Sequence, residues 1–481
     1  MSGFVLGIDI GADSSAVAYY DAVRGEAAAV DISGGYGVPS SPTVVEYANG
    51  EWVFGEYALS GGEDGAVFTR LPERLGKGEY ASAGGRPTPI REITGEYIRD
   101  MIAFVKGADP KAGVEAIVAA SPADWPAAAA EDLRAAFVHA GYGSALADIR
   151  DARECAAARL LAGRDGQPTI IADFGAGAFR VGLYERRGGF VDCLSSVSYP
   201  DLGADALGRA ADSFVAGLYE KSAGEPSARD VRQLERFCRS HRRLLLGRQS
   251  AKDVKLYVSF AYPPFAMTAR DADIRAVTKP FAEGIRAAVT AAGERAAVSA
   301  VCLMGGGFEY PFARAAAAKA FPRAELICPK VPAVALAEGA CLIAAAGLGL
   351  APAFPKLRDV NRLSRGVGVR VRAGNAARFF PIAPEGAYWW DKFPEGTFLL
   401  TEPTDAPPVV EIYSGGRDGV KLTDLTLTGL PRRPAGTTVV GVSLAFSAAD
   451  TLDVAVRDVG FGEQFPSAGG SARTKVKLET I

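Results

Sequence analysis

The segment FVLGIDIGADSSAVAYYD, residues 4–21, runs from an apolar strand through an aspartate and a glycine turn into a second apolar strand. IIADFGAGAFRVGLYE, residues 170–185, has the same layout and aligns with it without a gap, at the 164-residue spacing between positions 9 and 173. The matched pairs are Asp9 with Asp173, Gly11 with Gly175, Val17 with Val181 and Tyr20 with Tyr184. A single D-x-G turn is common by chance, but agreement at several positions with one offset predicts a duplicated β-hairpin unit.

Each hairpin is followed by sequence with helical periodicity. In the first half, helices are expected over 92–106 and 126–140, with a buried strand, VEAIVAAS at 114–121, between them. In the second half, the pattern predicts helices over 203–221, 229–247 and 271–292 and a strand in DVKLYVSF at 253–260. We therefore expect two α/β lobes, each beginning with a D-x-G hairpin.

A third glycine turn lies in AVSAVCLMGGGFEYPF, residues 297–312. A strand enters three glycines, and a helix is expected to start near Pro311. Glycines that leave a strand let backbone N–H groups approach a ligand closely, because no Cβ intervenes. A tight strand-to-helix turn without a ligand would use the same residues, so both interpretations stay open.

The last third of the chain has a different pattern. APAFPKL, within 351–358, is typical of a linker. Beyond it the sequence alternates with a period of two between Gly- and Pro-containing turns, which predicts an antiparallel all-β domain, a sandwich of about 120 residues. The expected strands are 367–372, 409–414, 422–430, 439–447, 451–459 and 474–481.

Composition excludes several classes of function. The net charge is −3 and there is no basic run, which argues against nucleic acid and against electrostatic membrane binding. Only two histidines occur, so a His-ligated zinc site or a Ser-His-Asp triad is disfavoured. Six scattered cysteines with apolar neighbours predict buried, reduced thiols and, with no signal peptide recognised, a cytoplasmic protein. The apolar run 333–354 contains Glu338 and is expected to be a packed helix rather than a membrane span.

Two D-x-G hairpins, a later strand-GGG-helix and paired α/β lobes resemble the actin-like ATPase fold shared by actin, sugar kinases and DnaK-type heat-shock chaperones. The β domain favours the last group: RDVNRLSRGVGVRV (358–371) and LTDLTLTGLPRRPAGTTVVGVSLAF (422–446) are similar to the DnaK-type substrate-binding sandwich. The resemblance implies a nucleotide-binding domain at 1–350, with lobes at about 1–165 and 166–350. It further implies a linker at 351–358 and a substrate-binding-like sandwich at 359–481. The family's helical lid has no counterpart.

The resemblance also implies a site for ATP or ADP with Mg²⁺. Asp9 and Asp173 match the aspartates that hold Mg²⁺, mostly through water, and Glu154 matches a glutamate near the attacking water. The expected phosphate-facing turns contain Gly11, Ala12, Asp13, Gly175, Ala176 and Gly177. The positions beside adenosine are Gly305, Gly306 and Gly307, and the adenine-facing positions are Arg239 and Arg242.

Departures from the family pattern affect catalysis. The family's turn threonines are Ala12, Asp13 and Ala178 here, and Arg180 replaces an aspartate. Each lost hydrogen bond to a charged group is worth roughly 1.5–3 kcal/mol, so two or three together slow hydrolysis by orders of magnitude. The catalytic lysine has no clean match; the candidates are Arg70, Arg74 and Lys77, with Glu73 able to occupy its place. We expect nucleotide binding with slow or impaired hydrolysis.

Simpler interpretations remain for these residues. The two aspartates can be ordinary turn residues, Glu154 a charge at a helix N-terminus, and Arg239 and Arg242 a solvated helix face. In the β domain, Phe379 and Phe380 can line a peptide groove or belong to the core. The same choice applies to Tyr388, Trp389 and Trp390, and the family's peptide-pocket positions match Ala376 and Ala377.

Two functions follow from these alternatives. The first is a DnaK-like, nucleotide-regulated protein whose β domain binds a polypeptide segment or protein partner, with no nucleic acid and no membrane insertion. The second is a non-catalytic scaffold or adaptor that keeps the fold. A sugar kinase is disfavoured because the β domain has no place in that architecture.

Overall fold

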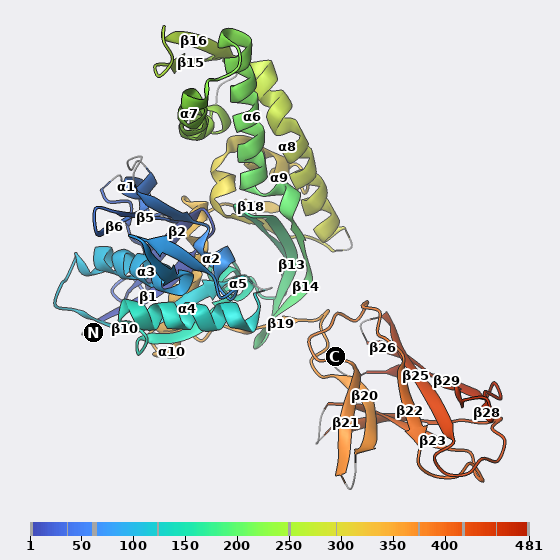
Figure 1. Cartoon of the computed structure of the whole chain (residues 1–481). Helices are drawn as coiled ribbons and strands as arrows, with labels where there is room; N and C mark the ends of the chain where they lie inside the picture. The colour runs from blue at the N-terminus through green and yellow to red at the C-terminus, as the bar shows by residue number, and fades with distance from the viewer. Residues whose placement is uncertain are drawn as a thin grey trace. The chain divides into compact units, whose positions relative to one another are not determined.

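The computed structural model describes residues 3–35, 37–59, 65–122, 125–248, 252–294, 296–373, 376–415, 419–448 and 450–478. The chain forms two compact units, Met1–Arg358 and Asp359–Ile481, and each is described by itself (Figure 1). The first unit contains two lobes, each built on its own six-stranded sheet. The second unit consists of strands.

The first lobe has a sheet in the order β11-β10-β1-β2-β3, with β4 paired to β2. β1 runs antiparallel to β2 and parallel to β10, so Asp9 lies between Ala16 and Ala120 at the end of β1. The strands are β1 Gly3–Ile10, β2 Ser14–Asp21, β3 Glu26–Ala29, β4 Ser41–Pro42, β10 Gly113–Ser121 and β11 Leu146–Asp151.

The second lobe repeats this order. Its sheet runs β18-β17-β12-β13-β14, and β19 extends it at the β14 edge. β12 is antiparallel to β13 and parallel to β17, which places Asp173 between Arg180 and Met304, as Asp9 lies in the first sheet. The strands are β12 Thr169–Phe174, β13 Phe179–Arg187, β14 Phe190–Tyr199, β17 Ala300–Met304, β18 Glu325–Ile327 and β19 Lys356–Asp359. An equal strand order with both aspartates at equivalent positions is what a duplicated unit produces.

Two helices make core contacts beyond the lobes to which the expected bounds of 1–165 and 166–350 assign them. α5 (Ala152–Leu160) buries Ala157 and Leu160 against the second sheet, whereas α10 (Ala335–Gly347) buries Ala340 and Ala344 against the first. The two helices cross where a Cβ on Gly339 would lie 1.8 Å from the carbonyl oxygen of Cys155. Glycine is required there because the two backbones touch. These helix contacts join the two lobes within one compact unit.

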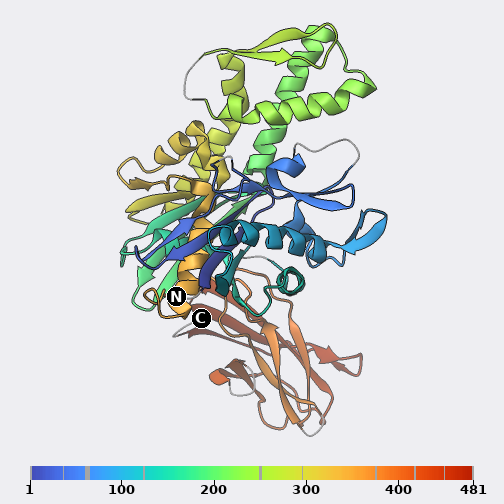
Figure 2. The same cartoon turned by 90° about the vertical axis from the view of Figure 1, so that its left-hand side faces the viewer.

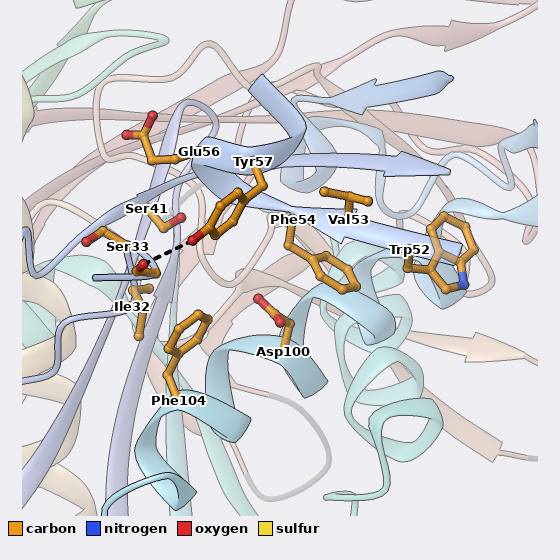
Figure 3. A pocket seen from close by; sticks show the side chains of 11 residues that line it. Ile32, Ser33, Ser41, Trp52, Val53, Phe54, Glu56, Tyr57, Asp100 and Phe104 are labelled. Carbon is orange, nitrogen blue, oxygen red and sulfur yellow. Dashed lines mark hydrogen bonds between the residues drawn. The ribbon is translucent and has the colours of Figure 1, made fainter. Parts of the chain in front are cut away.

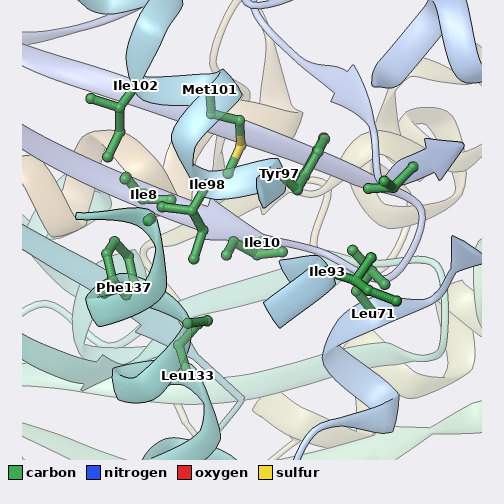
Figure 4. Packing of buried hydrophobic residues seen from close by; sticks show 14 of the residues in the cluster. Ile8, Ile10, Leu71, Ile93, Tyr97, Ile98, Met101, Ile102, Leu133 and Phe137 are labelled. Atoms are coloured by element: carbon green, nitrogen blue, oxygen red, sulfur yellow. The ribbon is translucent and has the colours of Figure 1, made fainter. Parts of the chain in front are cut away.

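The other face of the first sheet is covered by α3 (Ile90–Lys106) and α4 (Ala127–Ala140) (Figures 1 and 4). On α3, residues three and four apart share one apolar face, which is why the segment folds as an amphipathic helix. Ile98, Met101 and Ile102 on α3 pack against Ile8 and Phe137 in the core that Figure 4 shows. Gly141 caps the C-terminus of α4 with a φ of 88°, a left-handed conformation that glycine adopts without the steric cost of a Cβ.

A small layer of strands flanks the first lobe. The sheet β6-β5-β7 and the hairpin β8-β9 lie between β4 and α3 in the chain, with two short helices. Their bounds are β5 Val44–Ala48, β6 Glu51–Phe54, α1 Gly55–Leu59, β7 Ala66–Thr69, α2 Leu71–Arg74, β8 Tyr80–Ala83 and β9 Arg86–Pro89.

Three helices cover the second sheet, and an outer subdomain extends from them (Figure 2). The covering helices are α6 Ala204–Ala223, α8 Asp271–Gly293 and α9 Pro311–Ala318. The outer subdomain has its own core and adds α7 Ala228–Leu246, β15 Val254–Val258 and β16 Phe265–Ala269. Three one-turn helices join these elements: η1 Pro200–Leu202, η2 Gly306–Glu309 and η3 Pro332–Val334.

The residues expected as a linker, 351–358, belong to the first unit. The amide of Lys356 donates to Gly189 O at 3.2 Å, and Arg358 forms a bidentate ion pair with buried Asp192 at 2.7 and 2.9 Å. The same guanidinium lies 4.8 Å from the centre of the Phe190 ring. These contacts fix β19 on β14, so the unit ends at Arg358 rather than at residue 350.

The second unit is a sandwich of two four-stranded antiparallel sheets, β21-β20-β23-β24 and β22-β25-β26-β29, around one core. β21 and β22 lie outside the segments in which the period-two pattern predicts strands. Pro381 interrupts β21, an edge strand, where a missing N–H is tolerated. The strands are β20 Val367–Ala373, β21 Ala376–Ala383, β22 Gly396–Leu400, β23 Val409–Ser414, β24 Val420–Thr426, β25 Thr438–Ala448, β26 Thr451–Asp458, β27 Gly460–Phe461, β28 Phe465–Pro466 and β29 Ser471–Lys477.

The structure shows where the cysteines and the apolar run 333–354 lie. Five cysteines are buried and Cys328 is half-buried, and all six thiols are free. No helix in the described part of the chain has the length and apolar content that a bilayer span requires. The run 333–354 contains α10, which packs in the first unit.

Candidate functional site between the lobes

The first turn connects β1 to β2 and is braced from β4. The amide of Gly11 donates to Ser14 O at 3.1 Å, so this amide is used inside the turn instead of facing a phosphate. A Cβ on Gly11 would lie 2.3 Å from the same oxygen, which explains the glycine. Thr43 completes the brace: its hydroxyl donates to Gly11 O at 2.7 Å and its amide to Asp13 O at 2.9 Å. The amides of Ala12 and Asp13 donate to no acceptor in the described residues.

The second turn connects β12 to β13 and is fixed by α6. The first amides of α6, on Ala204 and Asp205, donate to the carbonyl oxygens of Gly175 and Ala176 at 2.9 and 3.0 Å. Gly203 permits this contact, because a Cβ there would lie 2.5 Å from Ala176 O. Only the carbonyls of the turn are used in this way. The amides of Gly175, Ala176 and Gly177 have no acceptor within the described chain.

In the glycine turn 305–307, the first and third glycines are closely packed and the second is open. Gly305 has a φ of 87°, and a Cβ there would lie 2.5 Å from Asp173 Oδ1. A Cβ on Gly307 would lie 2.3 Å from the Phe174 ring. Packing alone therefore explains these two glycines. Gly306 is exposed, has nothing within 4 Å of a built Cβ, and is the position of the three that a ligand can approach.

Asp9 and Asp173, at the equivalent ends of β1 and β12, are both half-buried. Burial raises the pKa of Asp9 to about 7, and the charge of Asp173 adds to the shift. Burial also raises the pKa of Asp173 to about 6, against the opposing effect of the Arg180 guanidinium. Two carboxylates that resist ionisation together gain from a cation between them.

Arg180 stands directly opposite Asp173 across the β12–β13 hairpin. It makes no hydrogen bond or ion pair in the part of the chain that the structure describes. Its guanidinium can therefore offset the charge of Asp173 or accept an anion.

A group of charged side chains surrounds Asp13 at the edge of the site. Burial raises the pKa of Asp13, Asp205 adds to the shift, and Arg242, Arg70 and Arg239 oppose it. Arg242 also forms an ion pair with Asp212 on α6, with Nε 2.7 Å from the carboxylate, so much of its charge is used there. Arg239 is exposed. The charges of both arginines thus reach the first turn.

Among the three candidates for the position of the catalytic lysine, Arg70 contacts the second lobe. It donates to Asp205 at the start of α6 and holds Glu73 through Nε at 2.6 Å. Glu73 in turn lies 3.2 Å from a Cβ built on Gly177. Arg74 pairs with Glu79 at 2.6 Å inside the first lobe, and Lys77 is exposed. Arg70 and Glu73 together therefore place an ion pair beside the second turn.

Glu154 lies in the first turn of α5, whose N-cap Asp151 accepts from the amide of Arg153 at 2.7 Å. Burial raises the pKa of Glu154, and Arg150 at 3.5 Å opposes the shift. The pKa of the buried Cys155 thiol is raised by burial and also by the charges of Glu154 and Asp9. The three groups are therefore close enough to interact.

Asp9 and Asp173 are the candidate side chains for holding a metal. In the described residues, no three or more His, Cys, Asp or Glu side chains gather around one point. Mg²⁺ commonly keeps several waters and takes one or two carboxylates plus phosphate oxygens. Asp9 and Asp173 fit that mode of binding and would supply the protein's share of the ligands.

The candidate peptide residues of the second unit fall on β21. Ala377 is exposed, close to the tip of the β20–β21 hairpin, and for Ala376 the backbone alone is described. Phe380 is exposed and meets Phe398 edge to face at 5.4 Å, while Phe379 is half-buried. The remaining aromatics form one group: Tyr388 stacks on Trp390, Trp389 packs against the core, and Arg362 lies over Tyr388.

Residues 362–478 match a family described as a domain of unknown function, DUF8552. The DUF8552 region begins three residues after Asp359 and includes every strand from β20 to β29. It therefore coincides with the second unit and contains none of the residues between the lobes.

Proposed function

We propose that the first unit binds ATP or ADP with Mg²⁺ between its lobes and that nucleotide binding regulates a polypeptide-binding or partner-binding activity of the DUF8552 region. The proposal is a DnaK-like function on an actin-like ATPase fold, in the cytoplasm. One observation carries it: five amides that have no acceptor within the described residues, on residues 12, 13 and 175–177, lie in the two turns that follow the carboxylates of Asp9 and Asp173. Unpartnered amides in turns bind anions, and paired carboxylates bind a hard cation. Mg²⁺-nucleotide presents both.

We further propose that hydrolysis is slow. Water attack in line with the γ-phosphate needs groups that orient the water and stabilise charge. Ala12 and Ala178 have no hydroxyl for this purpose. Arg70 is engaged by two carboxylates, which leaves less of its charge for a phosphate. We assign the water-orienting role to Glu154; its charge raises the pKa of the Cys155 thiol, as the charge of Asp9 also does, which supports a position near Asp9.

Calorimetry with ATP and ADP, with and without Mg²⁺, tests the binding step. We expect binding that weakens about ten-fold or more in Asp173→Asn. Glu131→Gln, which removes an exposed carboxylate on α4, should bind as the wild type does. Absence of nucleotide binding at millimolar concentration would contradict the proposal.

A second candidate is a scaffold or adaptor that has lost the ATPase. Arg180 beside Asp173 and the amide of Gly11 used inside its own turn favour it. Single-turnover phosphate release separates the two functions: release within minutes to hours supports a slow ATPase, and binding without release supports a nucleotide-gated scaffold. Partner capture by the full chain with and without ATP then tests whether the DUF8552 region responds to nucleotide.

A further inference from the structure

A hollow of about 240 Å³ lies in the first lobe, away from the turns described above. It is bounded by the loop after β3, by β6 and α1, and by one face of α3 (Figure 3). Its wall includes the aromatic side chains of Trp52, Phe54, Tyr57 and Phe104 and the carboxylates of Glu56 and Asp100. Phe104 is 37% exposed and Tyr57 55%, so the rings are reachable from solvent.

Asp100 is the unexplained group in this wall. Its carboxylate points into the hollow (Figure 3) and makes no hydrogen bond or ion pair within the described residues. Burial alone raises its pKa to about 6, so the side chain is still mostly ionised at neutral pH. A half-buried carboxylate without a partner is unfavourable and is usually paired or hydrogen-bonded.

The neighbouring Tyr57 and Ser33 hydroxyls donate hydrogen bonds to acceptors other than Asp100. The Tyr57 hydroxyl donates to Gly34 O at 3.2 Å, and the Ser33 hydroxyl donates to Asp31 at 2.5 Å. No Arg or Lys occurs among the described residues that line the hollow. The site therefore combines negative charge with aromatic faces and lacks a positive group of its own.

The geometry points to a binding site for an alkylguanidinium or alkylammonium group, with the cation against Asp100 and its alkyl stem along the rings of Phe54, Tyr57 and Phe104. Cations are attracted to aromatic faces, and a carboxylate among such faces adds a charge-assisted contact. A carboxylate or phosphate ligand would be repelled by the same wall. The volume suits a charged head with a short stem, which a small amine or a basic side chain of a peptide both provide. The site shares no residue with the interlobe turns, so it stands independently of nucleotide binding.

Titration of the full chain with n-butylguanidinium and with its neutral isostere n-butylurea tests the charge requirement. Ligand-observed NMR or calorimetry should detect the cation and a much weaker response to the urea. A capped Ala-Arg-Ala peptide forms the second arm. Tighter binding of the peptide identifies a polypeptide side chain as the source, and tighter binding of the free cation identifies a small molecule.

Variants locate the response. Asp100→Asn should weaken n-butylguanidinium binding about ten-fold or more, and Phe104→Leu several-fold. Asp109→Asn, which removes an exposed carboxylate just beyond α3, is the matched control and should bind as the wild type. Since Asp100→Asn removes an unpaired charge, the variant should fold normally, and Asp100→Glu provides a second, charged variant at that position. Equal binding to the wild type and Asp100→Asn, or no binding of either cation up to about 50 mM, would overturn the assignment.

Discussion

Arg70 in the first lobe donates to the carboxylate of Asp205 in the first turn of α6, which belongs to the second lobe. Arg70 also has a left-handed backbone, with a φ of 55°, which a side chain-bearing residue adopts at a cost of about 1–3 kcal/mol. Its contacts with Asp205 and Glu73 hold it in that conformation. One residue thus links the lobes beside the turns where a phosphate is proposed to bind.

Loss of this link should change nucleotide kinetics more than stability. Because the Arg70 side chain is 42% exposed, Arg70→Ala should cost less than about 1 kcal/mol of unfolding free energy. Association and dissociation of a fluorescent nucleotide should both become several-fold faster in stopped-flow experiments, since the lobes separate more readily. Arg74→Ala, which breaks an ion pair inside the first lobe, is the control. Identical rates in the two variants would count against the link.

Mg²⁺ binding should depend on pH through the aspartate pair. A metal needs ionised carboxylates, so Mg²⁺ affinity should rise with pH through the region of the pKa values, about 6 and about 7, and level off above it. Isothermal titration between about pH 5 and about pH 8 measures this. A flat profile would mean that the pair is not the ligand set.

Stability should show the opposite dependence on pH. The folded-state pKa of Asp9 lies above its usual 3.8, so between about pH 4 and pH 7 the native state holds a proton that the unfolded chain has released. Stability contributed by the protonated form is therefore lost as pH rises through that window. Asp9→Asn should exceed the wild type by more than about 1 kcal/mol at pH 8 and by little at pH 4, as measured by denaturant unfolding.

Arg180 should reduce the requirement for Mg²⁺. Because its guanidinium faces Asp173 and has no other partner in the described chain, it supplies positive charge next to the phosphate position. Arg180→Ala should lower nucleotide affinity in EDTA about ten-fold and in saturating Mg²⁺ by much less. Arg180→Lys should retain part of the effect. Equal losses with and without Mg²⁺ would assign Arg180 a structural role.

The glycine turn offers a paired test. Gly305→Ala places a Cβ 2.5 Å from Asp173 at a φ of 87° and should cost about 2 kcal/mol or more of stability. Gly306→Ala has open space and should leave stability unchanged. If adenosine lies against this turn, Gly306→Ala weakens nucleotide binding without loss of stability. Thermal unfolding and calorimetry on the two variants decide between a structural turn and a ligand-contacting one.

An ion pair in the second unit is fully buried. Arg433 binds Asp458 with two bonds of 3.0 and 3.1 Å, and their side chains are 3% and 0% exposed. Arg433→Met should destabilise the second unit by about 3–5 kcal/mol, since it leaves a buried carboxylate unpaired. Arg457→Ala, which breaks an exposed pair with Glu395, should cost less than about 1 kcal/mol in the same unfolding experiment.

Local patterns in the sequence predicted most elements but not their long-range partners. The period-two and helical patterns gave α3, α6 and α8 and most strands of the second unit, because each depends on its own residues. The contacts that α5 and α10 make outside their own lobes could not be predicted in this way, since they depend on residues about 180 apart in the sequence, as in the Arg159–Glu338 pair. Gly339, where the two helix backbones touch, reflects this packing in the sequence. A single glycine in an Ala-rich helix is, however, a weak signal.

The site shows the same limit. The 164-residue repeat paired Asp9 with Asp173, and in the structure the charge of Asp173 raises the pKa of Asp9. Thr43 could not be anticipated, because it contacts the first turn from 32 residues away, directly after β4. Asp100 gave no signal at all: one aspartate on the polar side of a predicted helix is ordinary, and only the surrounding aromatic rings make it unusual.

The short strand β19 has a consequence for the integrity of the first unit. β14 would otherwise end the second sheet with its N–H and C=O groups open to other chains, which is how sheets recruit foreign strands and aggregate. Residues 356–359 cap part of that border, anchored by Arg358 on Asp192. The segment that leads into the second unit therefore also protects the edge of this sheet. A first unit truncated at residue 350 would expose the edge strand β14 and should be more prone to aggregation.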